Sequence, residues 1–76
     1  MSNTTTIGSR IKELRTTKGV TLAVLGGSIG YSHAIISRWE RSVYTPNAYG
    51  IIALAKYFGV SCDYILCVTD NDKPYA

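Results

Sequence analysis

The sequence predicts an all-α domain, a compact five-helix arrangement that includes a helix-turn-helix. The chain has only 76 residues, which corresponds to a single domain at most. Hydrophobic residues make up 46% of it and charged residues 17%, which supplies enough apolar side chains for a folded core. Helix-capping residues and glycines recur at short intervals, so the helices are short. Short helices joined by tight turns favour a compact globule over a bundle of long helices.

The first predicted helix begins near Thr6 and ends before Gly19. Ile7, Ile11 and Leu14 lie at positions i, i+4 and i+7 within it, the spacing that places three side chains on one face of a helix. Glycine directly after such a stripe is a typical helix end. We therefore expect this face to contribute to the core.

The second predicted helix begins after Thr21, a good N-capping residue, and ends at Gly30. Its inward positions are Leu25, Gly26 and Ile29. Gly26 lies where close packing of two helices requires a small residue. The neighbouring Gly27 has no such packing reason and destabilises the helix by about 1 kcal/mol relative to alanine.

The third predicted helix has Ser32 as its N-cap and extends to about Arg41, before the segment that leads to Pro46. Ile36 and Trp39 share one side of it and should lie in the core. The second and third helices are thus separated by a very short connection that includes a glycine. This arrangement is the signature of a helix-turn-helix, whose second helix can enter a DNA major groove.

The fourth predicted helix is capped by Asn47 and ended by Gly59. Its core face follows the i, i+3, i+4, i+7 pattern and consists of Ile51, Leu54, Ala55 and Phe58.

A last helix begins after Ser61, with Asp63 in its first turn, where a negative charge suits the helix dipole. We expect both Ile65 and Leu66 to point inward. The sequence contains no strand of useful length, and the predicted domain spans residues 6–67, between a flexible N-terminal arm (1–5) and a polar tail (68–76).

The charge of the chain is unevenly distributed. The net charge is +3 and the isoelectric point is near 9.0. Residues 1–56 contain seven Lys or Arg and two Asp or Glu, whereas residues 57–76 contain one Lys and three Asp. The basic body permits a polyanionic partner but does not prove one.

Several functional classes find no support in the sequence. Cys62, Cys67 and a single His cannot form a four-ligand zinc site, so we expect two reduced, partly buried thiols in the last helix and no metal or cofactor. The sequence contains no paired nucleophile and base, no paired carboxylates at productive spacing and no phosphate-binding glycine loop. We therefore do not expect an enzyme. There is no apolar run of about 20 residues and no signal peptide, which predicts a cytoplasmic protein without a membrane partner.

Three segments together resemble a known family. They are residues 36–47 (ISRWERSVYTPN), 60–66 (VSCDYIL) and 10–15 (RIKELR). In sequence and mutual spacing they are similar to the helix-turn-helix domain of the Cro and lambdoid phage repressor family, which is XRE-like. The first segment is most similar to the P22 type of repressor. The resemblance extends over residues 7–66, and it implies a lambda-repressor-like fold.

The resemblance implies roles for particular residues. Arg15 and Glu40 occupy the positions of an interior ion pair between the first and third helices. Residues in the base-contacting positions of the family are Ser32, His33, Ala34, Ser37 and Arg38. Residues in its phosphate-contacting positions are Thr21, Arg41, Tyr44, Thr45 and Asn47. In each case the alternative is an ordinary solvated side chain, helix cap or loop residue.

The resulting leading hypothesis is a sequence-specific transcription regulator that binds double-stranded operator DNA as a homodimer. Dimer contacts would come from the last helix and the tail, for instance from Ile65, Cys67, Val68 and Tyr75. The resemblance to phage repressors also implies a bacterial host cell.

The alternative hypothesis is an antirepressor that binds another helix-turn-helix repressor through the same face. It rests on Leu22, where the family usually has Gln, and on Ile35, which replaces a polar residue. Together with Val24, Val43 and Tyr44, they would place unusual apolar area around the presumed DNA-binding surface, as protein-binding surfaces do.

Overall fold

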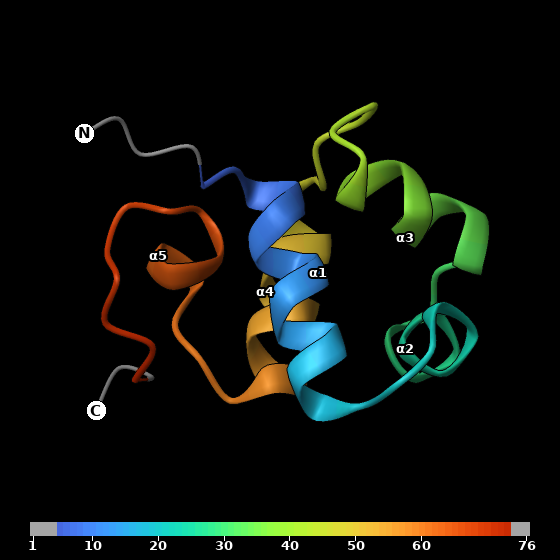
Figure 1. Cartoon of the computed structure of the whole chain (residues 1–76), viewed down its shortest axis with the longest axis horizontal. Helices are drawn as coiled ribbons and strands as arrows, with labels where there is room; N and C mark the ends of the chain where they lie inside the picture. The colour runs from blue at the N-terminus through green and yellow to red at the C-terminus, as the bar shows by residue number, and fades with distance from the viewer. Residues whose placement is uncertain (1–4, 74–76) are drawn as a thin grey trace.

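The computed structural model describes residues 5–73, and within this range it contains five α-helices and no strand. They are α1 (Ile7–Lys18), α2 (Leu22–Ile29), α3 (His33–Glu40), α4 (Ala48–Phe58) and α5 (Cys62–Ile65). α2 packs against α3 and α4, while α1 packs against α3 and α5, and α4 also contacts α5. The pair α2 and α3 lies at one side of the molecule and α5 at the other (Figure 1). In this part of the chain no helix has the length and apolar character needed to cross a membrane.

The predicted boundaries of the first four helices and the predicted start of the last one are confirmed, and the reason is capping chemistry. Each helix begins after a side-chain oxygen that accepts a hydrogen bond from the backbone N–H three residues later, which satisfies a donor that has no partner within the helix. These N-caps are Thr6, Thr21, Ser32, Asn47 and Ser61. Three helices then end at a glycine in the left-handed conformation, which only glycine adopts without strain.

The core faces predicted for the first four helices are confirmed as well. Each of these four helices contributes one side chain with no exposed area, namely Ile11, Leu25, Ile36 and Leu54, and Trp39 is 4% exposed. Phe58 is half-buried and packs against this cluster. Most of the hydrophobic contribution to folding therefore comes from one small core that all the helices share.

Two predictions for the last helix are wrong. Leu66 was expected to point inward but is 41% exposed, whereas Ile65 is completely buried. Cys67 lies beyond the helix, because α5 ends at Ile65 after about one turn. At Cys67 the backbone takes a φ of 65°, which turns the chain away from the helical path. Both cysteines are half-buried free thiols, as expected.

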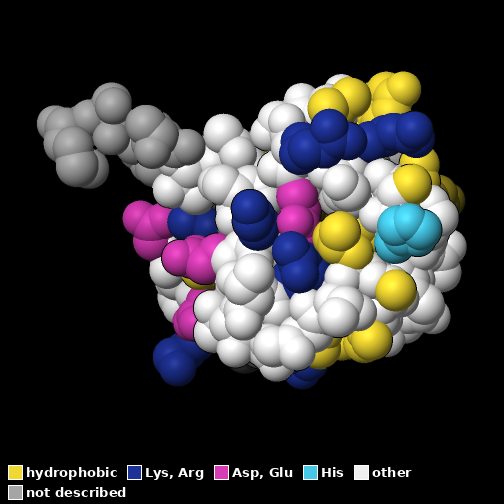
Figure 2. All heavy atoms as spheres, turned by 45° about the vertical axis from the view of Figure 1, so that its right-hand side comes forward, with side chains coloured by type: hydrophobic (Ala, Val, Ile, Leu, Met, Phe, Trp, Pro, Cys, Tyr) yellow, Lys and Arg dark blue, Asp and Glu magenta, His cyan; other side chains and the backbone are white. Residues whose placement is uncertain are grey.

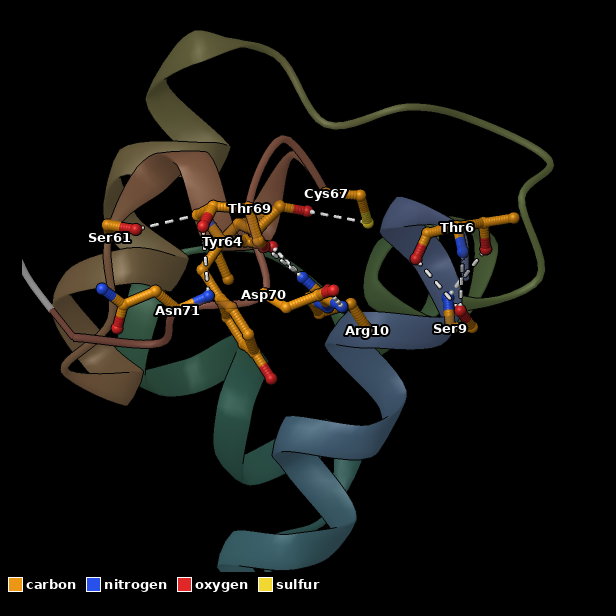
Figure 3. A network of polar contacts seen from close by, with 10 residues as sticks. Thr6, Ser9, Arg10, Ser61, Tyr64, Cys67, Thr69, Asp70 and Asn71 are labelled. Atoms are coloured by element: carbon orange, nitrogen blue, oxygen red, sulfur yellow. Dashed lines mark hydrogen bonds and ion pairs between the residues drawn. The ribbon is translucent and has the colours of Figure 1, made fainter. Parts of the chain in front are cut away.

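A buried arginine ties the segment after α5 to α1. Arg10 donates hydrogen bonds to the carbonyl oxygens of Tyr64 and Thr69, both at 2.9 Å, and to the Asp70 carboxylate at 3.0 Å. Its guanidinium also lies 4.1 Å from the centroid of the Tyr64 ring. Figure 3 shows the Arg10 side chain reaching from α1 to these partners in the C-terminal segment. This contact fixes residues 64–70 against the body of the domain.

Residues 1–4 and 74–76 are outside the described part of the chain. The predicted N-terminal arm therefore lies almost entirely outside it, as does Tyr75.

Candidate nucleic-acid interface

The connection between α2 and α3 is held by contacts with Gly26. Its carbonyl oxygen accepts hydrogen bonds from the N–H groups of Gly30 and Tyr31, at 2.8 and 2.9 Å. A Cβ atom at position 26 would clash with the Tyr31 carbonyl oxygen, whereas one at Gly27 would meet nothing within 4 Å. The predicted need for a small residue at 26 is thus confirmed. The turn fixes the position of α3 relative to α2.

One side of α3 is buried and the other is open. Ile36 and Trp39 are buried, and the ring of Trp39 makes an edge contact with Tyr31, with 4.8 Å between centroids. The side chains predicted to contact bases lie at the start of the helix and on its outer side: Ser32, His33, Ala34 and Arg38 are exposed and Ser37 is half-buried. Figure 2 shows this face, where the histidine lies at the surface and Lys and Arg side chains gather near it among hydrophobic ones.

The residues predicted to contact phosphate are all exposed. Two of them cap helices: Thr21 Oγ1 accepts from the Val24 N–H at 3.1 Å, and Asn47 Oδ1 accepts from the Gly50 N–H at 2.8 Å. A hydroxyl that accepts one hydrogen bond can still donate its proton, and the Asn47 amide group can still donate through nitrogen. The remaining three, Arg41, Tyr44 and Thr45, lie in the loop between α3 and α4.

That loop folds back on the end of α3. Ser42 adopts a φ of 62°, and the N–H groups of Val43 and Tyr44 then approach the carbonyl oxygen of Arg38, at 2.9 and 3.4 Å. The Arg38 guanidinium carbon lies 5.9 Å from the centroid of the Tyr44 ring. The loop and the outer side of α3 therefore form one continuous surface.

An ion pair joins the far end of α3 to α1. Arg15 donates from Nε and Nη2 to the two oxygens of the Glu40 carboxylate, at 2.6 and 3.0 Å. The two side chains are 15% and 6% exposed. The hydrogen bond to Glu40 raises the pKa of Arg15 above its ordinary value, against the opposing effect of burial. This bidentate geometry orients α3 as well as stabilising it.

The pairing of Glu40 with Arg15 leaves the surface around Arg38 and Arg41 positively charged. Residues 14–62, all of which the structure describes, contain five Lys or Arg but only one acidic residue, Glu40. Because Glu40 is occupied by Arg15, no free carboxylate in this stretch competes with an anion for Arg38 or Arg41. A surface on which basic side chains outnumber acidic ones attracts polyanions.

The apolar residues that motivated the alternative hypothesis differ in exposure. Leu22 and Ile35 are half-buried and pack against the core, so only part of each side chain is available to a partner. Val24, Val43 and Tyr44 are 50%, 55% and 57% exposed.

The residues expected to form a dimer are also distributed differently from the prediction. Ile65 is completely buried in its own core, so that part of the prediction is wrong. Cys67 is half-buried, and Val68 is 71% exposed. An apolar groove of about 350 Å³ lies between α4 and α5. Ile52 and Leu66, which line it, are both more than 40% exposed, whereas Cys67 and Val68 are not among its lining residues.

Two residues in this architecture were not singled out by sequence reasoning. Tyr31 connects the turn to both Trp39 and the Asn47 cap, whose Oδ1 accepts from its hydroxyl at 3.5 Å. An aromatic residue next to the Gly30 turn was the available signal. For Arg10 there was no local signal, because its partners lie 54 to 60 residues away.

Known proteins match this arrangement. A family model described as helix-turn-helix matches residues 11–65. The repressor protein C2 of Salmonella phage P22 is 41% identical over 64 residues, which are 84% of this chain and 30% of the phage protein. The chain thus spans less than a third of that relative's length.

The fold is similar to that of solved structures of the same phage repressor. A crystal structure of the P22 c2 repressor in complex with a synthetic operator matches with a TM-score of 0.80 and 40% identity, covering 83% of this chain and 96% of that one. The solution structure of the P22 c2 DNA-binding domain matches with a TM-score of 0.78 and 39% identity, covering 84% of each chain.

Proposed function

Because the chain belongs to the helix-turn-helix family, we propose that it is a sequence-specific DNA-binding transcription regulator of the phage repressor type. The observation that carries the proposal is the outer side of α3. It presents Arg38 and its polar neighbours to solvent, while the opposite side is anchored in the core. The similarity to a repressor solved with operator DNA supports the same function. In this proposal α3 lies in the major groove of an operator half-site.

Base recognition falls to the exposed outer residues of α3. Arg38 carries a planar guanidinium that can donate two hydrogen bonds to O6 and N7 of guanine, which discriminates against other bases by about 1–3 kcal/mol. His33 can donate to a purine acceptor, and Ala34 can contact a thymine methyl group. Ser32 and Ser37 complete the set.

Phosphate contacts come from residues on both sides of α3. Thr21 and Asn47 lie at the N-termini of α2 and α4, where unpaired N–H groups and the helix dipole favour a negative group. Arg41, Tyr44 and Thr45 lie in the loop after α3. Such contacts set the register of the protein on DNA without determining sequence.

The proposal is tested by replacing two exposed arginines that lie three residues apart. Arg38→Ala should weaken binding to the preferred site and abolish discrimination at one base position. Arg41→Ala should weaken binding to all sequences and reduce the slope of log K against log salt concentration by about 1. Titrations at two salt concentrations measure both effects. Lys56→Ala, the same loss of charge on α4, is the control and should leave affinity nearly unchanged. Equal and negligible effects of both arginine variants would contradict this position of the binding surface.

We propose further that the protein binds DNA as a homodimer, through the apolar groove between α4 and α5. Leu66 and Ile52 offer exposed apolar side chains there, and Val68, two residues after Leu66 in the chain, is exposed as well. Val68→Lys should shift the mass measured by light scattering towards that of the monomer, and weaken operator binding. Val43→Lys, at another exposed valine, is the control for the scattering experiment. A wild-type protein that stays monomeric at high concentration, with and without operator, would contradict the dimer.

The antirepressor hypothesis has less support than the sequence suggested, since Leu22 and Ile35 pack against the core. Co-elution with a second repressor, together with absent DNA binding, is the result that would restore it.

A further inference from the structure

Tyr44 does more in this structure than occupy a phosphate-contacting position. We propose that Tyr44 is a positioning residue for Arg38: its ring holds the guanidinium in place, and so contributes to the choice of base. This inference rests on the proposed DNA-binding function. It differs from the phosphate role in the part of the side chain that acts, because the ring and not the hydroxyl is responsible.

The contact between the two side chains has the geometry of a cation–π interaction. The guanidinium carbon of Arg38 lies 5.9 Å from the centroid of the Tyr44 ring, within the distance of about 6 Å at which the ring attracts a cation. A free arginine side chain samples many rotamers and loses this freedom when it binds a base. A ring that already restricts the guanidinium removes part of that loss, which is the general benefit of preorganisation.

No other group in the described structure restrains Arg38 in this way. The nearest acid along the chain, Glu40, is held by Arg15 through two hydrogen bonds. The Arg38 side chain makes no hydrogen bond or ion pair within residues 5–73. Among hydrogen bonds, ion pairs and ring contacts within residues 5–73, the contact with the Tyr44 ring is therefore the one that can orient the guanidinium.

The backbone of Tyr44 is held in turn by the backbone of Arg38. The N–H groups of Val43 and Tyr44 point to the carbonyl oxygen of Arg38 at 2.9 and 3.4 Å, and the positive φ of Ser42 makes this reversal of the chain. The backbone of Arg38 thus fixes the position of the Tyr44 backbone, and the Tyr44 ring restricts the position of the Arg38 guanidinium. The two residues are therefore linked both through their backbones and through their side chains.

Two substitutions at position 44 separate the ring from the hydroxyl. Tyr44→Phe keeps the ring and removes the hydroxyl, whereas Tyr44→Leu removes both. Because Tyr44 is 57% exposed, neither change should disturb the core, and circular dichroism checks that both variants fold. Arg38→Ala identifies the base position that depends on Arg38.

Binding to the selected site and to its single-base variants gives the first test. Tyr44→Phe should retain wild-type discrimination at the position that depends on Arg38. Tyr44→Leu should reduce discrimination there by about two- to fivefold, the magnitude of an exposed cation–π contact, and leave the other positions unchanged. In the Arg38→Ala background, Tyr44→Leu should have no further effect on discrimination. A loss of affinity that is equal for Phe and Leu and uniform across sequences would overturn the proposal in favour of a hydroxyl contact with phosphate.

A second test needs no DNA. In the proton NMR spectrum, the δ-methylene signals of Arg38 should be shifted by the ring current of Tyr44 in the wild type and in Tyr44→Phe, and return to ordinary values in Tyr44→Leu. Signals that are the same in all three proteins would overturn the proposal even if the protein binds its operator. A wild-type protein that shows this shift but selects no DNA sequence would overturn the proposed function, and with it the role of Tyr44 in base choice.

Discussion

The helix α1 and the segment from α3 to α4 use arginine in opposite ways. In α1, Arg10 and Arg15 are buried and engaged by acceptors from distant parts of the chain. In the second region, Arg38 and Arg41 are exposed and face no free acid. A buried guanidinium with its acceptors in place supports the fold, whereas an exposed one remains available for a ligand. The difference predicts that removing the partners or the side chains of the two arginines in α1 lowers stability, and that replacing Arg38 or Arg41 lowers DNA affinity.

The largest effect should come from removing the charge of Glu40. Glu40→Gln keeps the shape of the side chain but leaves the Arg15 guanidinium buried without a counter-charge, which costs about 3–5 kcal/mol. Urea denaturation followed by tryptophan fluorescence measures the change in free energy of unfolding, since Trp39 is the single tryptophan. Glu13→Gln, at an exposed position of α1, is the control. A loss below about 1 kcal/mol would mean that the ion pair is not a structural requirement.

A smaller loss should follow from replacing Arg10. Arg10→Met keeps much of the length of the side chain but removes the donor to the Thr69 carbonyl oxygen and one of the donors to the Tyr64 carbonyl oxygen, which keeps its hydrogen bond from the Cys67 N–H. An unsatisfied buried polar group costs about 1–3 kcal/mol. The effect should appear as lower stability and as faster hydrogen exchange in residues 64–70, with Lys12→Met as the control. Unchanged exchange in that segment would show that Arg10 does not hold it.

The acidic partner of Arg10 should matter least. The Asp70 side chain is 87% exposed, and ion pairs open to solvent contribute less than about 1 kcal/mol. Asp70→Asn should therefore change the free energy of unfolding only slightly, with Asp72→Asn as the control in the same denaturation experiment. A loss as large as that of Arg10→Met would mean that the carboxylate, and not the backbone carbonyl groups, is the main partner.

The raised pKa values of Arg10 and Arg15 do not make stability depend on pH near neutrality. Burial lowers the pKa of Arg10, but its bond to Asp70 and nearby negative groups outweigh this, so the pKa is raised, as it is for Arg15. A raised pKa contributes stability that is lost only as the pH rises past the ordinary value. For arginine this lies far above the pH of an unfolding experiment, so both guanidiniums stay charged.

Local chemistry made most of the fold predictable. A capping side chain and a terminal glycine act within a few residues, so Thr21 and Gly30 identify α2 from the sequence alone. Helical periodicity likewise identified Ile36 and Trp39 as core residues. The Arg15 and Glu40 pair was implied by family resemblance, because nothing in the local pattern joins residues 25 positions apart.

The parts that could not be predicted depend on long-range geometry. The inward position predicted for Ile65 is confirmed, whereas the one predicted for Leu66 failed, because α5 is a single turn, too short for periodicity to define a face. The partners of Arg10 lie at the other end of the chain. The contact between Arg38 and Tyr44 depends on the backbone reversal at Ser42, and serine carries no sequence signal for a positive φ.

The most direct test of the central claim is selection of binding sites from a random pool of double-stranded DNA, followed by affinity measurements at two salt concentrations. The account predicts an enriched palindrome whose half-sites are about one helical turn apart, bound more tightly than unselected DNA at both salt concentrations. Weak, steeply salt-dependent binding with no enriched sequence would reflect phosphate attraction alone, and would contradict a sequence-specific regulator.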